Sequence, residues 1–287
     1  MVQNPGIEPH IHPFIVGSKY KNQDTHYYLH TSPEFHMKQL LSEGLEKIFT
    51  LCYCFRDEPK SPIHNPQFLM LEWYRKNETY HKIMQDTEEL IKASYEHMKS
   101  FGSKMRWKSI PDFQKVTISE IFKDILNINI LDFLEISSLK SLIQKDFKDV
   151  PLPTIDLEWD DYFFLLYLNK IEPKIAKIPA LLLYEFPHHL SALSTLKEDD
   201  PRVCERFEIY LDGIELCNSF NEITELQILK KRFHYQNQQK NKQYHYTLPE
   251  PKRFYKAMEN YPKSAGIALG VERLLLSLIE IENPFWS

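Results

Sequence analysis

Apolar and polar residues alternate along two stretches near the amino terminus, residues 47–55 and 67–74. A period of two is typical of β-strands, because successive side chains point to opposite faces of a sheet. One face of the first stretch carries Phe49, Leu51, Tyr53 and Phe55. One face of the second carries Phe68, Met70, Glu72 and Tyr74. The sequence therefore predicts two strands joined by a long polar loop.

A helix is predicted just before these strands. It opens at Thr31 or Ser32, has Pro33 and Glu34 in its first turn, and ends at Gly44.

Other elements follow from helical spacing, from short apolar runs and from turn residues. They are a helix at 80–98, further helices within 117–147 after an irregular patch near Trp107, a buried strand at 180–186, a hairpin turning at Asp212-Gly213, a polar helix from about 222 to 242, and a strand that runs into a helix at 264–281. Hairpins flanked by helices predict an α+β fold around a mostly antiparallel sheet.

Composition narrows the function classes. A chain of 287 residues with 43% hydrophobic content can bury one large core, so a single domain spanning 1–287 is predicted. A net charge of −5 disfavours a broad nucleic-acid surface, which needs clustered Lys and Arg. No apolar run approaches the ~20 residues that span a bilayer, and the amino terminus lacks the zones of a signal peptide. We therefore expect a cytoplasmic protein without membrane contact. The four cysteines form no C-x-x-C pair and are interpreted as reduced structural thiols.

The loop between the first two strands carries a candidate nucleotide site. Arg56 and Glu58 follow the first strand, and His64 and Asn65 precede the second. A guanidinium suits a phosphate, a carboxylate suits an exocyclic amine, and Phe68 could stack on a base. A solvated loop with a surface ion pair fits the same spacing, and this alternative stays open.

A second cluster lies around the hairpin at 206–222. Glu208 and Glu215 stand on either side of the turn, and Asn218 and Glu222 continue beyond it. Two carboxylates facing each other across a hairpin suit a magnesium ion that bridges phosphate oxygens. Paired acids on solvated strands are the alternative, and Glu222 is equally placed to offset the dipole of a following helix.

The third candidate is the stretch "GIALGVER", residues 266–273. Small residues on a strand let a ligand approach the backbone, and Arg273 then projects where a helix starts. A tightly packed corner between strand and helix is the alternative.

Taken in order, these stretches resemble the class II aminoacyl-tRNA synthetases: "FRDE…HNPQF" resembles motif 2 and "GIALGVER" resembles motif 3. Through "TSPE", "HNPQFLMLEWY" and "RFEIYLDGIELCNSFNE" the chain is similar to the lysyl enzymes over nearly its whole length. The stretches "PGIEPHI", "LEWYR" and "GIALG", with no anticodon-binding barrel ahead of them, make it similar to the shortened relatives that ligate (R)-β-lysine to elongation factor P. The class II catalytic fold is therefore expected, without the long helix of the first family motif.

The resemblance implies roles for the nucleotide site. The implied ATP-binding residues are Arg56, Glu58, His64, Asn65, Phe68, Glu215 and Arg273. Arg56 would contact the α-phosphate and the substrate carboxylate, and Arg273 the γ-phosphate, which makes these two the implied catalytic residues. The resemblance further implies Mg²⁺ held by Glu208 and Glu215.

For the amino acid, the resemblance implies Glu34 near one amine, Asn218 at the carboxylate, and Glu222 with Tyr74 at the far ammonium, supported by Glu72. Ala268 stands where ordinary lysyl enzymes carry glycine, and its methyl group is worth about 1–3 kcal/mol of discrimination. The implied substrate is thus (R)-β-lysine or lysine, the acceptor is a lysine on elongation factor P, tRNA is disfavoured, and a homodimer is the assembly typical of the family.

Two other functions stay open. A stand-alone lysyl-adenylate former could act on tRNA or another acceptor. A silent synthetase-like binding module is the alternative from another class, because Gln67 and Ser219 depart from the family pattern.

Overall fold

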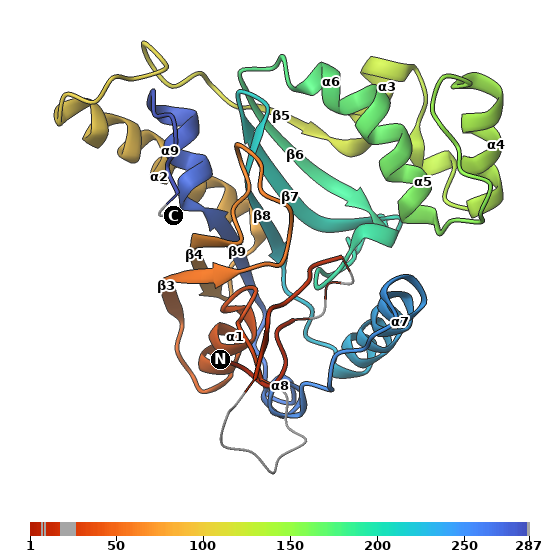
Figure 1. Ribbon diagram of the computed structural model, residues 1–287, viewed down its shortest axis with the longest axis horizontal. Coiled ribbons are helices and arrows are strands. Elements are labelled where there is room, and N and C mark those ends of the chain that lie inside the picture. Colours follow the sequence, from red (N-terminus) through yellow and green to blue (C-terminus); the bar gives the residue numbers. More distant parts are fainter. Residues whose placement is uncertain (7, 9, 18–26, 286–287) are drawn as a thin grey trace. The chain divides into compact units, whose positions relative to one another are not determined.

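The two strands predicted at the start of the chain pair as a hairpin in the computed structural model, which describes residues 1–6, 8, 10–17 and 27–285 (Figure 1). Contacts divide the chain into two compact units. Unit 1 comprises Met1–Lys108 and Asn221–Ser287, and unit 2 comprises Ser109–Phe220. That the chain forms a single domain stays a prediction. Among the described residues, no helix has both the length and the apolar character needed to cross a bilayer.

Unit 1 is built on three antiparallel strands with β4 in the middle, paired to β3 on one side and β9 on the other. Its elements are β1 (Ile15–Val16), β2 (Tyr27–Tyr28), α1 (Glu34–Ser42), β3 (Lys47–Phe55), β4 (Gln67–Lys76), α2 (Tyr80–Ser100), α7 (Leu226–Tyr244), α8 (Lys252–Met258), β9 (Ser264–Gly270) and α9 (Val271–Leu278). The predicted strands, and the strand that runs into a helix at the end of the chain, are confirmed.

Two predicted helix starts are wrong, each for a local reason. Helix α1 begins at Glu34, because Ser32 stays outside the helix and its Oγ accepts a hydrogen bond from the Glu34 N–H at 3.3 Å. Helix α7 begins at Leu226 rather than near residue 222, because β8 continues to Asn221. Glu222 therefore lies outside the first turn of α7, and the interpretation of Glu222 as a residue offsetting that helix dipole is wrong.

The two faces of β3 differ as predicted, but the face that carries the large apolar side chains is exposed to solvent. Phe49, Leu51 and Tyr53 are 76%, 54% and 41% exposed. The opposite face carries Cys54, whose register partner is Phe68 on β4. The sheet of unit 1 thus buries the face that carries the candidate chemistry and presents an apolar face on its edge strand.

Unit 2 pairs β6 antiparallel with β7, β7 antiparallel with β8, and β5 parallel to β6. Its elements are β5 (Gln114–Thr117), α3 (Ile118–Leu126), η1 (Ile130–Asp132), α4 (Ile136–Asp146), α5 (Trp159–Leu166), η2 (Tyr167–Ile171), α6 (Glu172–Ile175), β6 (Ala180–Pro187), η3 (His188–Leu190), β7 (Val203–Leu211) and β8 (Ile214–Asn221). The sequence prediction missed β5 and α5. The predicted α+β class with a mostly antiparallel sheet is confirmed.

The helices of unit 2 pack on its strands through a cluster of aromatic side chains. Phe122 of α3, Phe163 of α5 and Tyr167 stack with ring centroids 5.4 to 6.5 Å apart. Offset ring pairs at such distances are worth about 0.5–1.5 kcal/mol beyond the area they bury. This cluster fixes α3 and α5 against β6.

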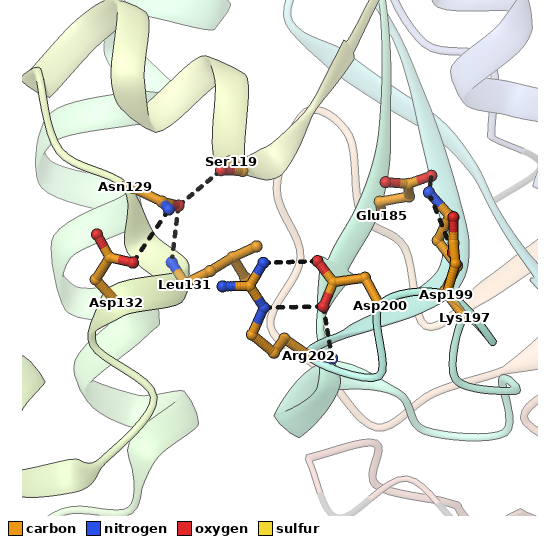
Figure 2. A network of polar contacts seen from close by, with 9 residues as sticks. All are labelled: Ser119, Asn129, Leu131, Asp132, Glu185, Lys197, Asp199, Asp200 and Arg202. Carbon is orange, nitrogen blue, oxygen red and sulfur yellow. Dashed lines mark hydrogen bonds and ion pairs between the residues drawn. The ribbon is translucent and has the colours of Figure 1, made fainter.

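Polar contacts hold the surface of unit 2 around the start of β7 (Figure 2). Arg202 donates two hydrogen bonds to Asp200, each 2.8 Å long. Lys197 pairs with Glu185 at 2.8 Å. Nearby, Asn129 accepts a hydrogen bond from the Leu131 N–H and so caps η1. The Arg202–Asp200 pair is partly solvent-exposed, so it contributes little stability, about 0–1 kcal/mol.

The hairpin between β7 and β8 requires its glycine. Asp212 and Gly213 both have positive φ, at 53° and 75°, which is the geometry of the tight turns that asparagine, aspartate and glycine favour. A Cβ on Gly213 would lie 3.1 Å from Ala176. The predicted hairpin is confirmed, and the turn also packs on the end of α6.

We therefore expect Gly213→Ala to lower the free energy of unfolding by about 1–2 kcal/mol, because alanine meets both an unfavourable φ and a close contact. Urea unfolding followed by circular dichroism measures the difference. Gly17→Ala is the control, since Gly17 is exposed with open space around its Cβ position. Equal stability of the two variants would contradict the prediction.

Candidate active site

One face of β4 carries most of the predicted chemistry of unit 1. Phe68, Glu72 and Tyr74 share this face because they are separated by even numbers of residues. Across the sheet, Ala268 of β9 is the register partner of Glu72, and Gly266 is the partner of Tyr74. Long polar and aromatic side chains on β4 thus lie beside small residues on β9.

The sequence prediction explained the glycine at position 266 by a ligand that approaches the backbone. The structure gives a different reason for this glycine. A Cβ at this position would lie 2.2 Å from two ring carbons of Tyr74 and 2.8 Å from Glu222 Oε1. No real Cβ comes so close to another heavy atom, so the glycine is required by the tyrosine ring that crosses it. At Gly266, the group that approaches the backbone is therefore a side chain of the protein, not a ligand.

Three acids converge at this end of the sheet: Glu34 from α1, Glu72 from β4 and Glu222 from the segment after β8. Glu72 and Glu222 are buried, and Glu34 is partly buried. The Tyr74 hydroxyl donates a hydrogen bond to Glu72 Oε2 at 3.1 Å. We call Glu34, Glu72, Tyr74 and Glu222 the acidic pocket. The structure brings together the residues that were predicted to bind an amine or ammonium in this unit.

The sequence prediction missed a residue of this pocket, Lys38. Its Nζ lies 2.6 Å from Glu34 Oε1 and 2.6 Å from Glu222 Oε2. The available signal was its spacing from Glu34, since residues four apart on a helix are neighbours. The contact with Glu222 had no signal in the sequence.

Burial governs the protonation of these acids. It raises the pKa of Glu72 well above the usual range of a glutamic acid, and the nearby Glu34 carboxylate raises it further. Burial also raises the pKa of Glu222, which Lys38 partly offsets, to about 7. Burial thus favours the neutral form of Glu72, whereas the charge of Glu222 depends on its ion pair with Lys38 and on bound cations.

The nucleotide loop presents a cation above an aromatic ring. The Arg56 guanidinium lies 5.2 Å from the centre of the Phe68 ring, within the range of a cation–π contact. Arg56 Nε is buried without a hydrogen-bond partner among the described residues. A buried donor without an acceptor is costly, so this nitrogen is suited to an anionic ligand.

A second arginine of the loop region is held by His64. Arg273 of α9 donates from Nη2 to His64 Nε2 at 2.8 Å and from Nε to the Ile63 carbonyl at 3.3 Å. Because arginine only donates, Nε2 must accept, so His64 is neutral with its proton on Nδ1, which donates to Ser61 Oγ at 2.8 Å. Burial and then Arg273 lower the pKa of His64, in agreement with the neutral form.

The other two predicted residues of the loop, Asn65 and Glu58, interact with neighbouring residues of the loop. Asn65 Nδ2 donates to the Gln67 carbonyl at 2.7 Å and so shapes the loop. Glu58 is partly exposed, and its charge acts on His64. Sequence reasoning missed Glu272, which is buried and accepts a hydrogen bond from the Leu69 N–H at 2.8 Å. That bond joins the first turn of α9 to β4 and thereby positions Arg273.

Unit 2 holds the remaining predicted residues, and Arg206 contacts two of them. This arginine donates to Asn218 Oδ1 at 3.1 Å and to Glu208 Oε1 at 2.5 Å, and its guanidinium lies 4.6 Å from the Phe186 ring centre. The Tyr210 hydroxyl donates to the other oxygen of Glu208 at 2.6 Å. The sequence prediction missed Arg206, although its two-residue spacing from Glu208 places both on one face of β7.

The predicted opposition of Glu208 and Glu215 is wrong. The two-residue turn pairs Glu215 with Tyr210, and a register shift between Ile209 and Tyr210 makes Asn218 the partner of Glu208. The two acids are therefore diagonal neighbours on one face of the hairpin. Both offer carboxylate oxygens, the donor type that Mg²⁺ takes, and each oxygen of Glu208 keeps a lone pair beyond its present hydrogen bond. The residues thus fit a magnesium ion by donor type.

The protonation of Glu72 gives a testable pH dependence. A buried acid with a raised pKa leaves the protein most stable below the usual pKa of about 4.5, and stability is lost as the pH rises through the raised value. We expect Glu72→Gln to be more stable than the parent chain at pH 8–9 and nearly equal at pH 5. Urea unfolding across this range measures the difference. Glu89→Gln, on the exposed side of α2, is the control, and parallel pH curves for the parent chain and Glu72→Gln would contradict the protonation assigned here.

Comparisons with known proteins agree with this geometry. The family model "tRNA synthetases class II (D, K and N)" matches residues 1–283. The chain is 31% identical over 257 residues to a protein of Haemophilus influenzae (strain PittGG) named elongation factor P--(R)-beta-lysine ligase, covering 89% of this chain and 74% of the relative.

Two more relatives carry the same name. The protein of Histophilus somni (strain 2336) is 33% identical over 261 residues, covering 89% of this chain and 74% of its own. The protein of Salmonella arizonae is 30% identical over 287 residues, covering 99% and 83%. Matches of this extent show the family. The chain is a ligase that belongs to the class II tRNA synthetases.

Proposed function

We propose that this protein activates (R)-β-lysine, or lysine, with ATP as an aminoacyl-adenylate and transfers it to the ε-amine of a lysine on elongation factor P. The names of the relatives supply the acceptor and the amino acid. The supporting observation in this chain is the buried acidic pocket, whose carboxylates are not fully balanced by positive charge from the protein.

The layout of β4 fits such a substrate. Glu72 and Phe68 lie on one face, four residues apart, so about 13 Å separates them along the strand. This face of β4 therefore has acids that suit a cation at one end and an aromatic ring with an arginine at the other. An extended ligand with an ammonium group at one end and a nucleotide at the other fits both ends.

In the first step, a carboxylate oxygen of the amino acid bonds to the α-phosphorus of ATP while the bond to the pyrophosphate oxygen breaks. This displacement needs positioning and stabilisation of negative charge more than covalent help. Arg56, with its unpartnered Nε, holds the α-phosphate and the substrate carboxylate, and Phe68 stacks on adenine. Arg273 and the neutral His64 contact the outer phosphates, Glu58 the adenine amine, and Asn65 shapes the loop around them.

Mg²⁺ would be held by Glu208 and Glu215 and would neutralise charge on the phosphates. Asn218, held by Arg206, binds the substrate carboxylate. In the second step, the acceptor's ε-amine bonds to the carbonyl carbon of the adenylate, AMP leaves with the electrons of the C–O bond, and the amine loses a proton.

The acidic pocket recognises the amino acid. Glu222 and Tyr74 hold the far ammonium, Glu34 holds the other amine, and Glu72 supports Tyr74. The methyl group of Ala268, beside Glu72 in the register, narrows the space that a glycine would leave. We infer that this favours an amine in the shifted position of (R)-β-lysine.

ATP–pyrophosphate exchange with (R)-β-lysine, L-lysine and no amino acid tests the proposal. We expect exchange that depends on the amino acid and is faster with (R)-β-lysine. Ala268→Gly should shift the ratio of kcat/KM values toward L-lysine by roughly 10- to 100-fold, since one methylene is worth about 1–3 kcal/mol. Ala93→Gly, on the exposed side of α2, should leave the ratio unchanged.

The acceptor is then identified by mass. Elongation factor P should gain the mass of one lysyl group in the presence of ATP and (R)-β-lysine, while bulk tRNA should stay uncharged. Exchange without labelling of elongation factor P but with charging of tRNA would support a stand-alone lysyl-adenylate former. No exchange with either amino acid would leave a binding module as the better account.

We further propose that the protein forms the homodimer typical of its family through the exposed face of β3. Phe49, Leu51 and Tyr53 form an apolar stripe on an edge strand, and Leu45 just before it is 47% exposed. Contiguous exposed apolar side chains mark interaction surfaces more often than plain solvent-facing surface.

Leu51→Lys is therefore expected to convert a dimer into a monomer, because an unpaired charge in an apolar interface is costly. Light scattering after size exclusion measures the mass. Ile155→Lys is the control, since Ile155 is an exposed apolar residue outside this face, at 66%. A parent chain that is monomeric at micromolar concentration would refute the dimer.

A further inference from the structure

Lys38 is a buried cation that the proposed reaction leaves without a role. Its side chain is 1% exposed, and its ammonium contacts acids from two separate parts of the chain, Glu34 on its own helix and Glu222 beyond β8. Burial alone would lower the pKa of Lys38, but Glu222 and then Glu34 raise it above its usual range. The lysine therefore stays charged at any pH at which the protein is studied.

The charges around Lys38 do not balance. The ionisable groups that face it are Glu34, Glu72, Tyr74, Glu222 and Tyr261. Burial keeps Glu72, Tyr74 and Tyr261 in their neutral forms, because it raises the pKa of each of them. Glu34 and Glu222 both contact the one ammonium, so the pocket has a deficit of one positive charge whenever both are ionised. Without Lys38 the deficit would be two.

We propose that Lys38 is a positioning residue of the amino-acid pocket, which clamps Glu34 to Glu222 and leaves a deficit that one substrate ammonium fills. The inference rests on the proposed function, because it assigns the missing charge to the amino-acid substrate. This role explains why a pocket that binds the cationic side chain of a substrate also contains a lysine.

The clamp has two consequences for specificity. A carboxylate held by a short ion pair loses little further freedom when the substrate binds, which favours affinity. An apolar amino acid leaves the deficit unfilled, and uncompensated charge in a buried site is destabilising. The pocket thus rejects apolar side chains by charge as well as by shape.

The first experiment uses the ligand-free protein and tests the charge. In Lys38→Met the two carboxylates lose their counter-ion, so the pKa of Glu222, which burial already raises, rises further. Stability is then lost as the pH rises. We expect the free energy of unfolding of Lys38→Met to fall more steeply between pH 5.5 and 9 than that of the parent chain.

A second variant covers the case in which Lys38→Met does not fold at high pH. The double variant Lys38→Met with Glu222→Gln removes one charge of each sign, and it should recover the shallow pH dependence. Lys82→Met is the matched control, because Lys82 also pairs with an acid four residues away, Asp86, but at the surface. It should leave the pH dependence unchanged.

The second experiment measures binding of (R)-β-lysine and L-lysine by calorimetry at pH 8. We expect the dissociation constant to rise at least tenfold in Lys38→Met and not in Lys82→Met. In Lys38→Ala, where the side-chain volume is vacant, added ethylammonium should restore most of the affinity. In Lys38→Met, where the volume is filled, it should not.

The outcomes separate the two proposals. An unchanged pH dependence in Lys38→Met overturns the charge assignment, and a changed pH dependence with unchanged dissociation constants overturns the positioning role. If the parent chain binds neither amino acid, the proposed function fails, whereas a steeper pH dependence in Lys38→Met still supports the charge assignment in the ligand-free protein.

Discussion

The structure of unit 1 depends on the cost of burying charge. Three carboxyl groups from α1, β4 and the segment after β8 lie together where water has little access. Each would destabilise the fold if it were ionised and unpaired. The protein resolves this with a proton on Glu72 and with Lys38 between Glu34 and Glu222. The proposed cationic substrate rests on the negative charge that Lys38 leaves uncompensated.

Strand β4 connects this pocket to the nucleotide loop. Its position between β3 and β9 fixes which residues face one another, and position 266 is a glycine because the ring of Tyr74 lies against it. Glu272 joins α9 to the same strand through the Leu69 N–H. The arginine that follows it is thereby held beside His64.

In unit 2, a second set of polar groups is organised by Arg206. Its guanidinium lies between Phe186 and Phe220 and donates to Glu208 and Asn218. A hydrogen-bonded, aromatic-flanked arginine holds its partners in fixed positions. In both units, residues predicted to bind ligand are thus supported by a basic residue that sequence reasoning did not single out, Lys38 in one and Arg206 in the other.

Local chemistry explains what the sequence determined by itself. Alternation predicted β3 and β4, Asp212-Gly213 predicted the hairpin, and the order of the motifs pointed to the family, because each signal is carried by neighbouring residues. The tertiary structure alone decided the rest. The register shift at Ile209 that pairs Glu208 with Asn218 depends on how two strands pair. The contact of Lys38 with Glu222, and the protonation that follows from it, depends on burial among residues that are distant in the sequence, which no local pattern encodes.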